Sequence, residues 1–201
     1  MRWIGFAVTA VLLCHCSRPT TEPPSQAPPS THRSPSPSSP DPSPKQASLS
    51  PEELISLLPD PMTFPELREA LPPSMGRQVF PDGSLILRAS RELRFRNGGY
   101  LWVSVSDYTN ASARLQAEQQ LIQSPGKDYE SQQLEFIHLP DGLGYVLWDP
   151  ISRNGRFRAI VANRFLLQAE GGDMPTRIPW VRIAEFFPLD RYRRESVVQP
   201  N

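Results

Sequence analysis

The side chains best suited to catalysis are few in this sequence, and they lie far apart along the chain. His138 is the only histidine after residue 32, and a neutral imidazole can act as a general base or bind a metal ion. A zinc site needs three or four converging ligands, so a lone histidine does not make one. We therefore expect His138 to be a partly buried strand residue that is hydrogen-bonded to a neighbour.

Two pairs of carboxylates are further candidates for acid–base catalysis: Glu52 with Glu53, and Asp107 with Asp149. Such pairs are common on ordinary protein surfaces, and their spacing in the sequence does not bring them together. The glycines match neither the dinucleotide-binding pattern nor the P-loop, and no serine lies in a G-x-S-x-G motif. We therefore predict no catalytic residue, no metal site and no cofactor.

Arginine is the main basic residue, and two groups of it are dense. Arg94 and Arg96 form one group, and Arg156 and Arg158 belong to another. If strands bring these four together, they could bind phospholipid headgroups, an anionic glycan or an acidic protein. The alternative, which we favour, is a solvated face with acidic residues interspersed. The chain has 21 basic and 21 acidic residues, and this balance disfavours nucleic-acid binding.

The two cysteines, Cys14 and Cys16, both lie near the N-terminus, so the rest of the chain has no thiol for a disulfide, a metal site or a nucleophile. They follow a positive start at Arg2 and an uncharged, mostly apolar run over residues 3–13. This pattern is typical of a secretory signal. The run is too short for a membrane-spanning helix, which needs about 20 apolar residues.

The sequence Val11-Leu12-Leu13-Cys14-His15-Cys16-Ser17 resembles the end of a bacterial lipoprotein signal, although His15 stands where that class has a glycine or alanine. The resemblance implies a signal peptide over residues 1–16 and lipidation of Cys16, with Cys14 as the alternative. It also implies a lipid anchor in the cell envelope, at the outer membrane rather than the inner one because a serine follows Cys16. The other possibility is a plain cleaved signal and a soluble periplasmic or secreted protein.

Residues 17–50 contain ten prolines and ten serines, and their only aliphatic side chains are Ala27, Ala47 and Leu49. Such a segment cannot bury enough apolar surface to offset the entropy of ordering it. We predict a disordered linker that works as a spacer. Its prolines could instead be recognised by an aromatic groove of another protein, which we consider the weaker interpretation.

The folded region is predicted over residues 51–195, with a disordered tail at 196–201. Ser50 and Glu53 have capping-box spacing, which favours a helix over residues 51–58. Further helices are predicted at residues 64–71, 110–123 and 180–187. Alternation of apolar and polar residues predicts strands at 93–96, 100–108 and 157–169, the last with a bulge or bend near Asn163-Arg164. Two more strands are predicted at 134–139 and 144–148, around the turn residues Pro140-Asp141-Gly142.

From Leu93 onward, these elements follow the order β-β-α-β-β-β-α. Short connections favour antiparallel pairing. We expect an α+β fold: an antiparallel sheet of about five strands with helices packed on one face. A tethered domain with few candidate sites favours a non-enzymatic binding or assembly module of the bacterial envelope. The alternative function is an envelope or periplasmic enzyme that uses carboxylates, with or without His138.

Overall fold

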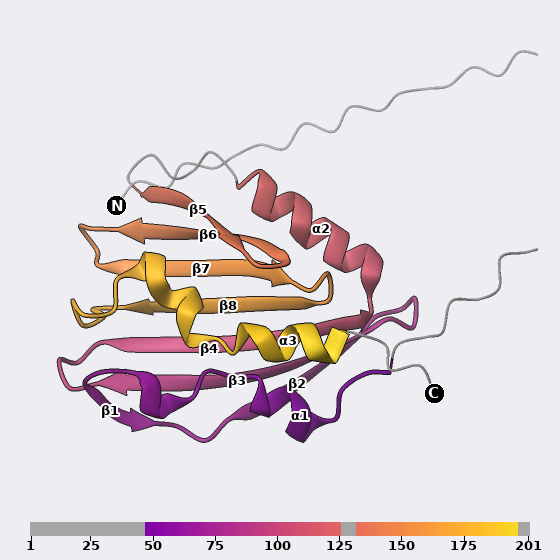
Figure 1. Cartoon of the computed structure of the whole chain (residues 1–201), viewed down its shortest axis with the longest axis horizontal. Coiled ribbons are helices and arrows are strands. Elements are labelled where there is room, and N and C mark those ends of the chain that lie inside the picture. The colour runs from indigo at the N-terminus through magenta and orange to yellow at the C-terminus, as the bar shows by residue number, and fades with distance from the viewer. Residues whose placement is uncertain (1–46, 126–131, 197–201) are drawn as a thin grey trace, which may run out of the picture. The chain divides into compact units, whose positions relative to one another are not determined.

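The structure is a computed structural model, and it describes residues 47–125 and 132–196 (Figure 1). The predicted signal peptide, the lipidation of Cys16 or Cys14, and most of the predicted linker therefore lie outside the described residues. So does the predicted tail beyond Ser196. In the described ranges, no helix combines the length and the apolar character needed to cross a membrane.

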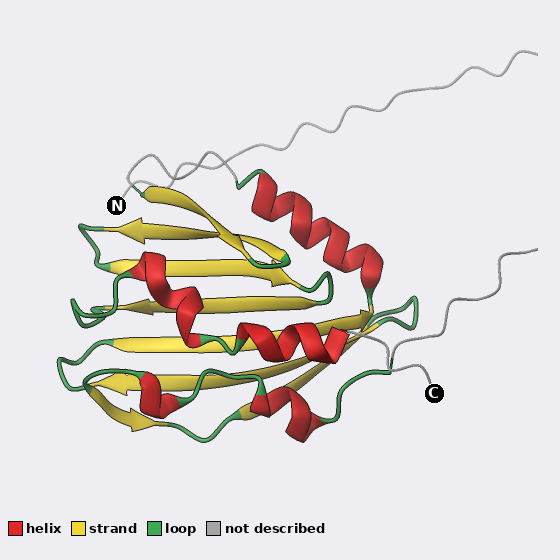
Figure 2. Cartoon of the chain, in the orientation of Figure 1, coloured by secondary structure: helices red, strands yellow, loops and turns green. Residues whose placement is uncertain are grey.

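Strands dominate the described chain and come in two runs, β1 to β4 and β5 to β8, with helices before, between and after them (Figure 2). Two of the helices, η1 and η2, are 3-10 helices. In chain order the elements are α1 (Pro51–Ser56), η1 (Pro61–Thr63), β1 (Leu67–Ala70), β2 (Ser74–Val79), β3 (Leu85–Phe95), β4 (Tyr100–Asn110), α2 (Ser112–Gln123), β5 (Gln133–Leu139), β6 (Gly142–Asp149), β7 (Asn154–Val161), β8 (Phe165–Gly172), η2 (Trp180–Phe186) and α3 (Leu189–Ser196).

All the strands belong to one antiparallel sheet of eight strands, in the order β1-β3-β4-β8-β7-β6-β5, with β2 also paired to β3. The prediction of about five strands in the order β-β-α-β-β-β-α is therefore wrong. It missed β1 and β2, and it merged β7 and β8 into one bent strand. Residues Ala162 and Asn163 have φ angles of 53° and 47°, so they form a tight turn that reverses the chain between the two strands.

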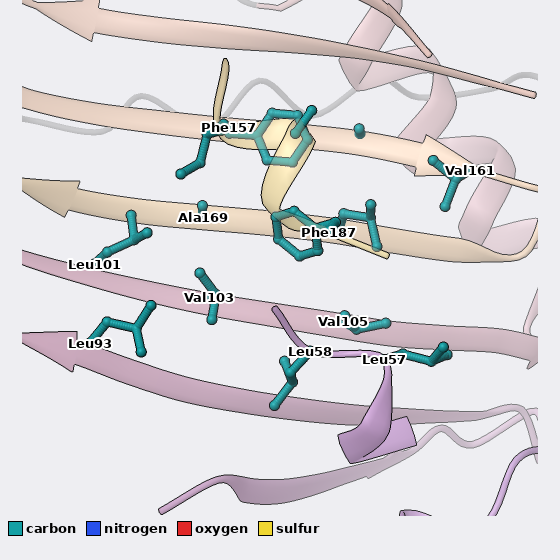
Figure 3. Packing of buried hydrophobic residues seen from close by; sticks show 14 of the residues in the cluster. Leu57, Leu58, Leu93, Leu101, Val103, Val105, Phe157, Val161, Ala169 and Phe187 are labelled. Atoms are coloured by element: carbon teal, nitrogen blue, oxygen red, sulfur yellow. The ribbon is translucent and has the colours of Figure 1, made fainter. Parts of the chain in front are cut away.

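Helices cover both faces of the sheet, so the prediction that they pack on one face is also wrong. The face that carries the larger core, here called the main-core face, is covered by α1, η1, η2 and α3 (Figure 1). Its buried side chains include Leu93, Leu101, Val103, Phe157 and Phe187 (Figure 3). The opposite face, here called the α2 face, is partly covered by α2, through a second cluster that includes Tyr108, Leu115, Ile122, Ile160 and Leu166.

Several local predictions are confirmed. Ser50 caps α1 by accepting a hydrogen bond from Glu53 N, and the Glu53 carboxylate accepts one from Ser50 N, so the capping box is complete. Asn97, Gly98 and Gly99 form the turn that joins β3 to β4. The helix predicted over 64–71 is wrong, because residues 67–70 form β1 and pair with the end of β3. The chain belongs to the fold before Pro51, since Leu49 is buried.

The two edges of the sheet differ. At one edge, β1 and β2 follow each other along β3 and are separated by Leu71-Pro72-Pro73. The pairing there also shifts register between Leu67 and Glu69. At the other edge, β5 is an uninterrupted strand of seven residues. It pairs with β6 and with no other strand in the described part of the chain.

Candidate binding pocket beside strand β5

A pocket of about 340 Å³ lies on the main-core face, beside the start of β5 and the end of β6. This volume falls within the range of about 300–1,000 Å³ that is usual for small-molecule and cofactor sites. Its walls are mostly apolar, and polar groups are interspersed among them. The lining residues are Gln133, Glu135, Val146, Trp148, Arg153, Met174, Pro175, Thr176, Ile178, Pro179, Trp180 and Val181.

Strand pairing positions one side of the pocket. Gln133 of β5 lies opposite Trp148 of β6, and Glu135 lies opposite Val146. Residues that are directly opposite in adjacent strands share a face of the sheet, so these four side chains lie together on the main-core face. The β5 residues are therefore both a wall of the pocket and the edge of the sheet.

The segment between β8 and η2 forms the other wall. Asp173 starts it with a φ angle of 49°, and its N–H donates to the carbonyl oxygen of Arg153, 3.0 Å away. The carboxylate of Asp173 also lies 2.9 Å from the guanidinium of Arg153. Further along, Ile178 N donates to Pro175 O at 2.9 Å. These bonds tie the wall to the turn between β6 and β7.

Trp180, the first residue of η2, packs its ring directly on the backbone of Gly155 in β7. A Cβ atom at position 155 would lie 2.1 Å from the Trp180 ring, so the close approach requires glycine. The rings of Trp148 and Trp180 have centroids 6.3 Å apart and planes inclined by 32°. Both aromatic walls are thus held in place by the sheet before any ligand binds.

The indole nitrogen of Trp180 is an unusual feature of this pocket residue. Trp180 is 5 % exposed, and its Nε1 atom is buried without a hydrogen-bond partner among the described residues. A buried donor that lacks an acceptor costs about 1–3 kcal/mol. The nitrogen lies against Gly155, 2.5 Å from the place that a Cβ atom would take there, so the cost comes with the close packing of the ring on the sheet.

The charged groups at the pocket differ in their partners. Arg153 is engaged by Asp173, as described above. Glu135 is exposed and forms no ion pair with any residue in the described ranges. The mouth of the pocket therefore has one uncompensated carboxylate, which favours a basic group on a ligand. The arrangement as a whole can hold an apolar group and orient polar ones.

The predicted catalytic candidates do not converge. His138 is exposed on β5, opposite Leu143, so the expectation that it is partly buried is wrong. Glu53 is a helix-capping residue, and its pKa is lowered mainly by a hydrogen bond from the backbone of Ser50 and less by one from the Ser50 side chain. Asp107 pairs with Arg164, whereas Asp149 accepts from Ile151 N and Ser152 in the turn after β6. No group of three or more His, Cys, Asp or Glu residues within 47–125 and 132–196 could hold a metal ion.

The predicted anion-binding arginines lie beside carboxylates. Arg94 is 2.8 Å from Glu92, and Arg156 is 2.8 Å from Glu170. Arg158 is 2.6 Å from Glu118 of α2. Arg96 is exposed in the turn after β3. The pairing fits the alternative we favoured, a solvated face of mixed charge, better than a bare electropositive surface.

Sequence reasoning missed the pocket, because its residues come from three separate stretches of the chain. Trp148 was placed in a strand and Trp180 in a helix, and both placements are confirmed, although η2 is a 3-10 helix. Neither was predicted to belong to a site. Pro175 and Pro179 before Trp180 argue against a regular strand or helix in that segment, but they do not indicate a pocket.

Comparison with known proteins adds no relative. No protein-family model matches the chain, and no curated protein and no solved structure matches it either.

Proposed function

We propose that this protein is a non-enzymatic binding module of the bacterial cell envelope and that its ligand site is the pocket beside β5. The observation that carries the proposal is a preformed, mostly apolar pocket with two tryptophan walls. Apolar pockets with a few convergent polar groups are the usual form of a ligand site. Tryptophan supplies a large contact area together with a hydrogen-bond donor.

Rigidity of the pocket supports the same proposal. Trp180 is held by its packing on Gly155, and the wall between β8 and η2 is tied to Arg153 through Asp173. A site that is ordered in advance loses little conformational entropy when a ligand binds. The chain therefore has a feature that favours affinity.

The membrane tether remains part of the proposal. It rests on the lipoprotein-like signal that ends at Cys16 and on the Pro/Ser-rich residues that follow it. Two or three acyl chains on one cysteine would give stable anchoring, and outer-membrane sorting follows from Ser17 in that class. Mass spectrometry of the native N-terminus tests this: we expect acylated Cys16, whereas an unmodified terminus at Ser17 would exclude the anchor.

Site-specific photo-cross-linking in the native envelope tests the binding function. We would place p-benzoylphenylalanine at Thr176, an exposed lining residue, and at Met62, which is 87 % exposed on η1 and serves as the matched control. We expect a discrete adduct from position 176 that is absent from position 62 and disappears in the Trp148→Ala background. No adduct at 176, or the same adducts from both positions, would contradict the proposal.

A further inference from the structure

We infer that the ligand of this pocket is an extended peptide segment of a partner protein, which adds a strand to the edge of β5 and places an apolar side chain in the pocket. The inference rests on the proposed binding function and names the partner class. Addition of a peptide strand to an open sheet edge is a common recognition mode: main-chain hydrogen bonds provide affinity, and pockets for alternate side chains provide specificity.

Strand β5 has one edge that no other strand in the described ranges covers. In an antiparallel pair, every second residue of an edge strand turns its N–H and C=O away from its neighbour. On β5, those groups have no partner strand in the described ranges, and Gln133, Leu134, Glu135, Phe136 and His138 are exposed. Natural edges are protected by proline, by lysine and other charged side chains, by inward-pointing charges or by a bulge. Glu135 is the one carboxylate that β5 carries. The β5 sequence has no proline or lysine, and its pairing with β6 is continuous.

The opposite edge shows what protection looks like in the same molecule. Pro72 and Pro73 interrupt the strand between β1 and β2, and proline has no N–H to offer a new strand. The register shift between Leu67 and Glu69 breaks the regular spacing further. A partner strand therefore finds a continuous row of backbone groups at β5 and a broken one at β1–β2.

The pocket adjoins the open edge of β5. Gln133 and Glu135 line the pocket and also belong to that edge. A peptide residue opposite Gln133 would lie in the same cross-strand row as Trp148, so its side chain would face the pocket. A peptide whose backbone pairs with β5 in this register would therefore also place one of its side chains in the pocket.

The same register predicts the peptide's composition. The residue two positions away would lie opposite Glu135, whose carboxylate has no ion-pair partner in the described chain, so a lysine or arginine is favoured there. The residue between them would face Leu134, which lies opposite Leu147 on the α2 face, so an apolar residue is favoured. We expect a segment with an apolar residue and a basic residue two positions apart, separated by a second apolar residue.

A second copy of this chain is the obvious competing occupant, and the structure disfavours it. On the main-core face, β5 would offer its partner Ile137 and Leu139, but both already pack against the core of their own molecule. The strand carries no lysine or arginine to meet Glu135. A twofold pairing centred on Glu135 would also place two carboxylates directly opposite each other, which is destabilising.

Peptide selection on the full-length chain tests the inference. A displayed library of random heptapeptides would be selected on the native protein, on Glu135→Lys, and on Glu52→Lys as the control. Glu52 is exposed in the first turn of α1, so the control changes the charge equally without touching the edge. We expect native protein and control to enrich the apolar-apolar-basic pattern. The Glu135→Lys variant should select an acidic residue instead and bind the original peptides about fivefold more weakly.

Backbone methylation of a selected peptide tests the strand pairing itself. N-methylation at the residues whose N–H groups face β5 should weaken binding about tenfold, and N-methylation at the alternate residues should not. The inference is overturned if no peptide is enriched, if methylation is tolerated at every position, or if Glu135→Lys keeps the original preference. It is also overturned if the protein is a dimer that Phe136→Lys dissociates, because a second copy then occupies the edge.

These outcomes separate the two proposals. If the cross-link from position 176 forms but no peptide is selected, the binding function stands and the ligand is not an extended peptide. If neither is observed, both proposals fail. If peptides are selected equally well by the native protein and by Trp148→Ala, the edge binds peptides without the pocket, and the inferred insertion is wrong.

Discussion

Arg164 and Asp107 form an ion pair whose side chains are 4 % and 1 % exposed. The guanidinium donates to both carboxylate oxygens, from Nε at 2.9 Å and from an Nη atom at 2.8 Å. The same arginine donates to the carbonyl oxygens of Ala47 and Glu195, and Leu49 N donates to Asp107. One buried pair thus fastens the start and the end of the described fold to strand β4 and to the turn before β8.

Replacement of one partner should be costly. Asp107→Asn leaves Arg164 buried without its countercharge, and removal of one member of a buried pair costs about 3–5 kcal/mol. We expect the free energy of unfolding, measured by urea titration, to fall by that amount. Glu185→Gln removes the partner of Arg182 at the surface and should leave the midpoint unchanged. Equal effects of the two substitutions would contradict this account of Asp107.

The same pair predicts a pH dependence. Burial by itself would raise the pKa of Asp107, but hydrogen bonds from Arg164 and Thr109 outweigh it and hold the pKa below its usual value. A lowered pKa in the folded state contributes stability above the unfolded value of about 3.9 and loses it as the pH falls toward the folded value. The native protein should therefore lose more stability than Asp107→Asn on acidification below about pH 4. Parallel stability curves would disprove this.

At the residue scale, the sequence analysis identified none of the pocket residues as part of a binding site. Residue type alone drew attention to His138 and to the arginines, because those side chains can do chemistry by themselves. Trp148, Trp180 and Glu135 acquire a role only through what lies opposite or beneath them. Gly155 is the clearest case, since its importance comes from the ring packed on it.

At the scale of elements, the contact between η2 and β7 determines the shape of the pocket. Gly155→Ala would place a methyl group 2.1 Å from the present position of the Trp180 ring, so the ring must move. Overpacking of this kind costs about 1–3 kcal/mol. We expect that loss in urea unfolding, a red shift of tryptophan emission, and loss of the cross-link from position 176. Gly76→Ala is the control, because its Cβ would lie 3.9 Å from the nearest atoms; a similar loss there would refute the argument.

Strands marked by an alternating pattern or by a turn signal were predictable, and the others were not. The prediction of β4 rests on alternation, and those of β5 and β6 rest on the turn residues between them; all three are confirmed, apart from their exact ends. All six residues of β2 are exposed, so no apolar face marks this strand. The turn between β7 and β8 contains no glycine, although Ala162 and Asn163 both have positive φ angles. Helix α3 was missed because only Tyr192 in it is fully buried.

At the scale of the whole molecule, the sequence predicted an antiparallel sheet but not its layers. The spacing of Leu115 and Ile122 in α2 indicates that this helix packs against the sheet, but it does not tell which face of the sheet the helix covers. The crossover from β4 through α2 to β5 places β5 at the far edge, and β8 returns to pair with β4. This long-range pairing leaves β5 without a second neighbour in the described chain and places the pocket beside it.

Amide hydrogen exchange of the native, full-length protein tests the central claim, an open edge at β5, most directly. Along Gln133–Leu139, we predict rapid exchange at every second amide and protection at the amides bonded to β6. In β4 and β8, which have neighbours on both sides, all amides should be protected. Uniform protection along β5 would contradict the account, because another strand would then already occupy that edge.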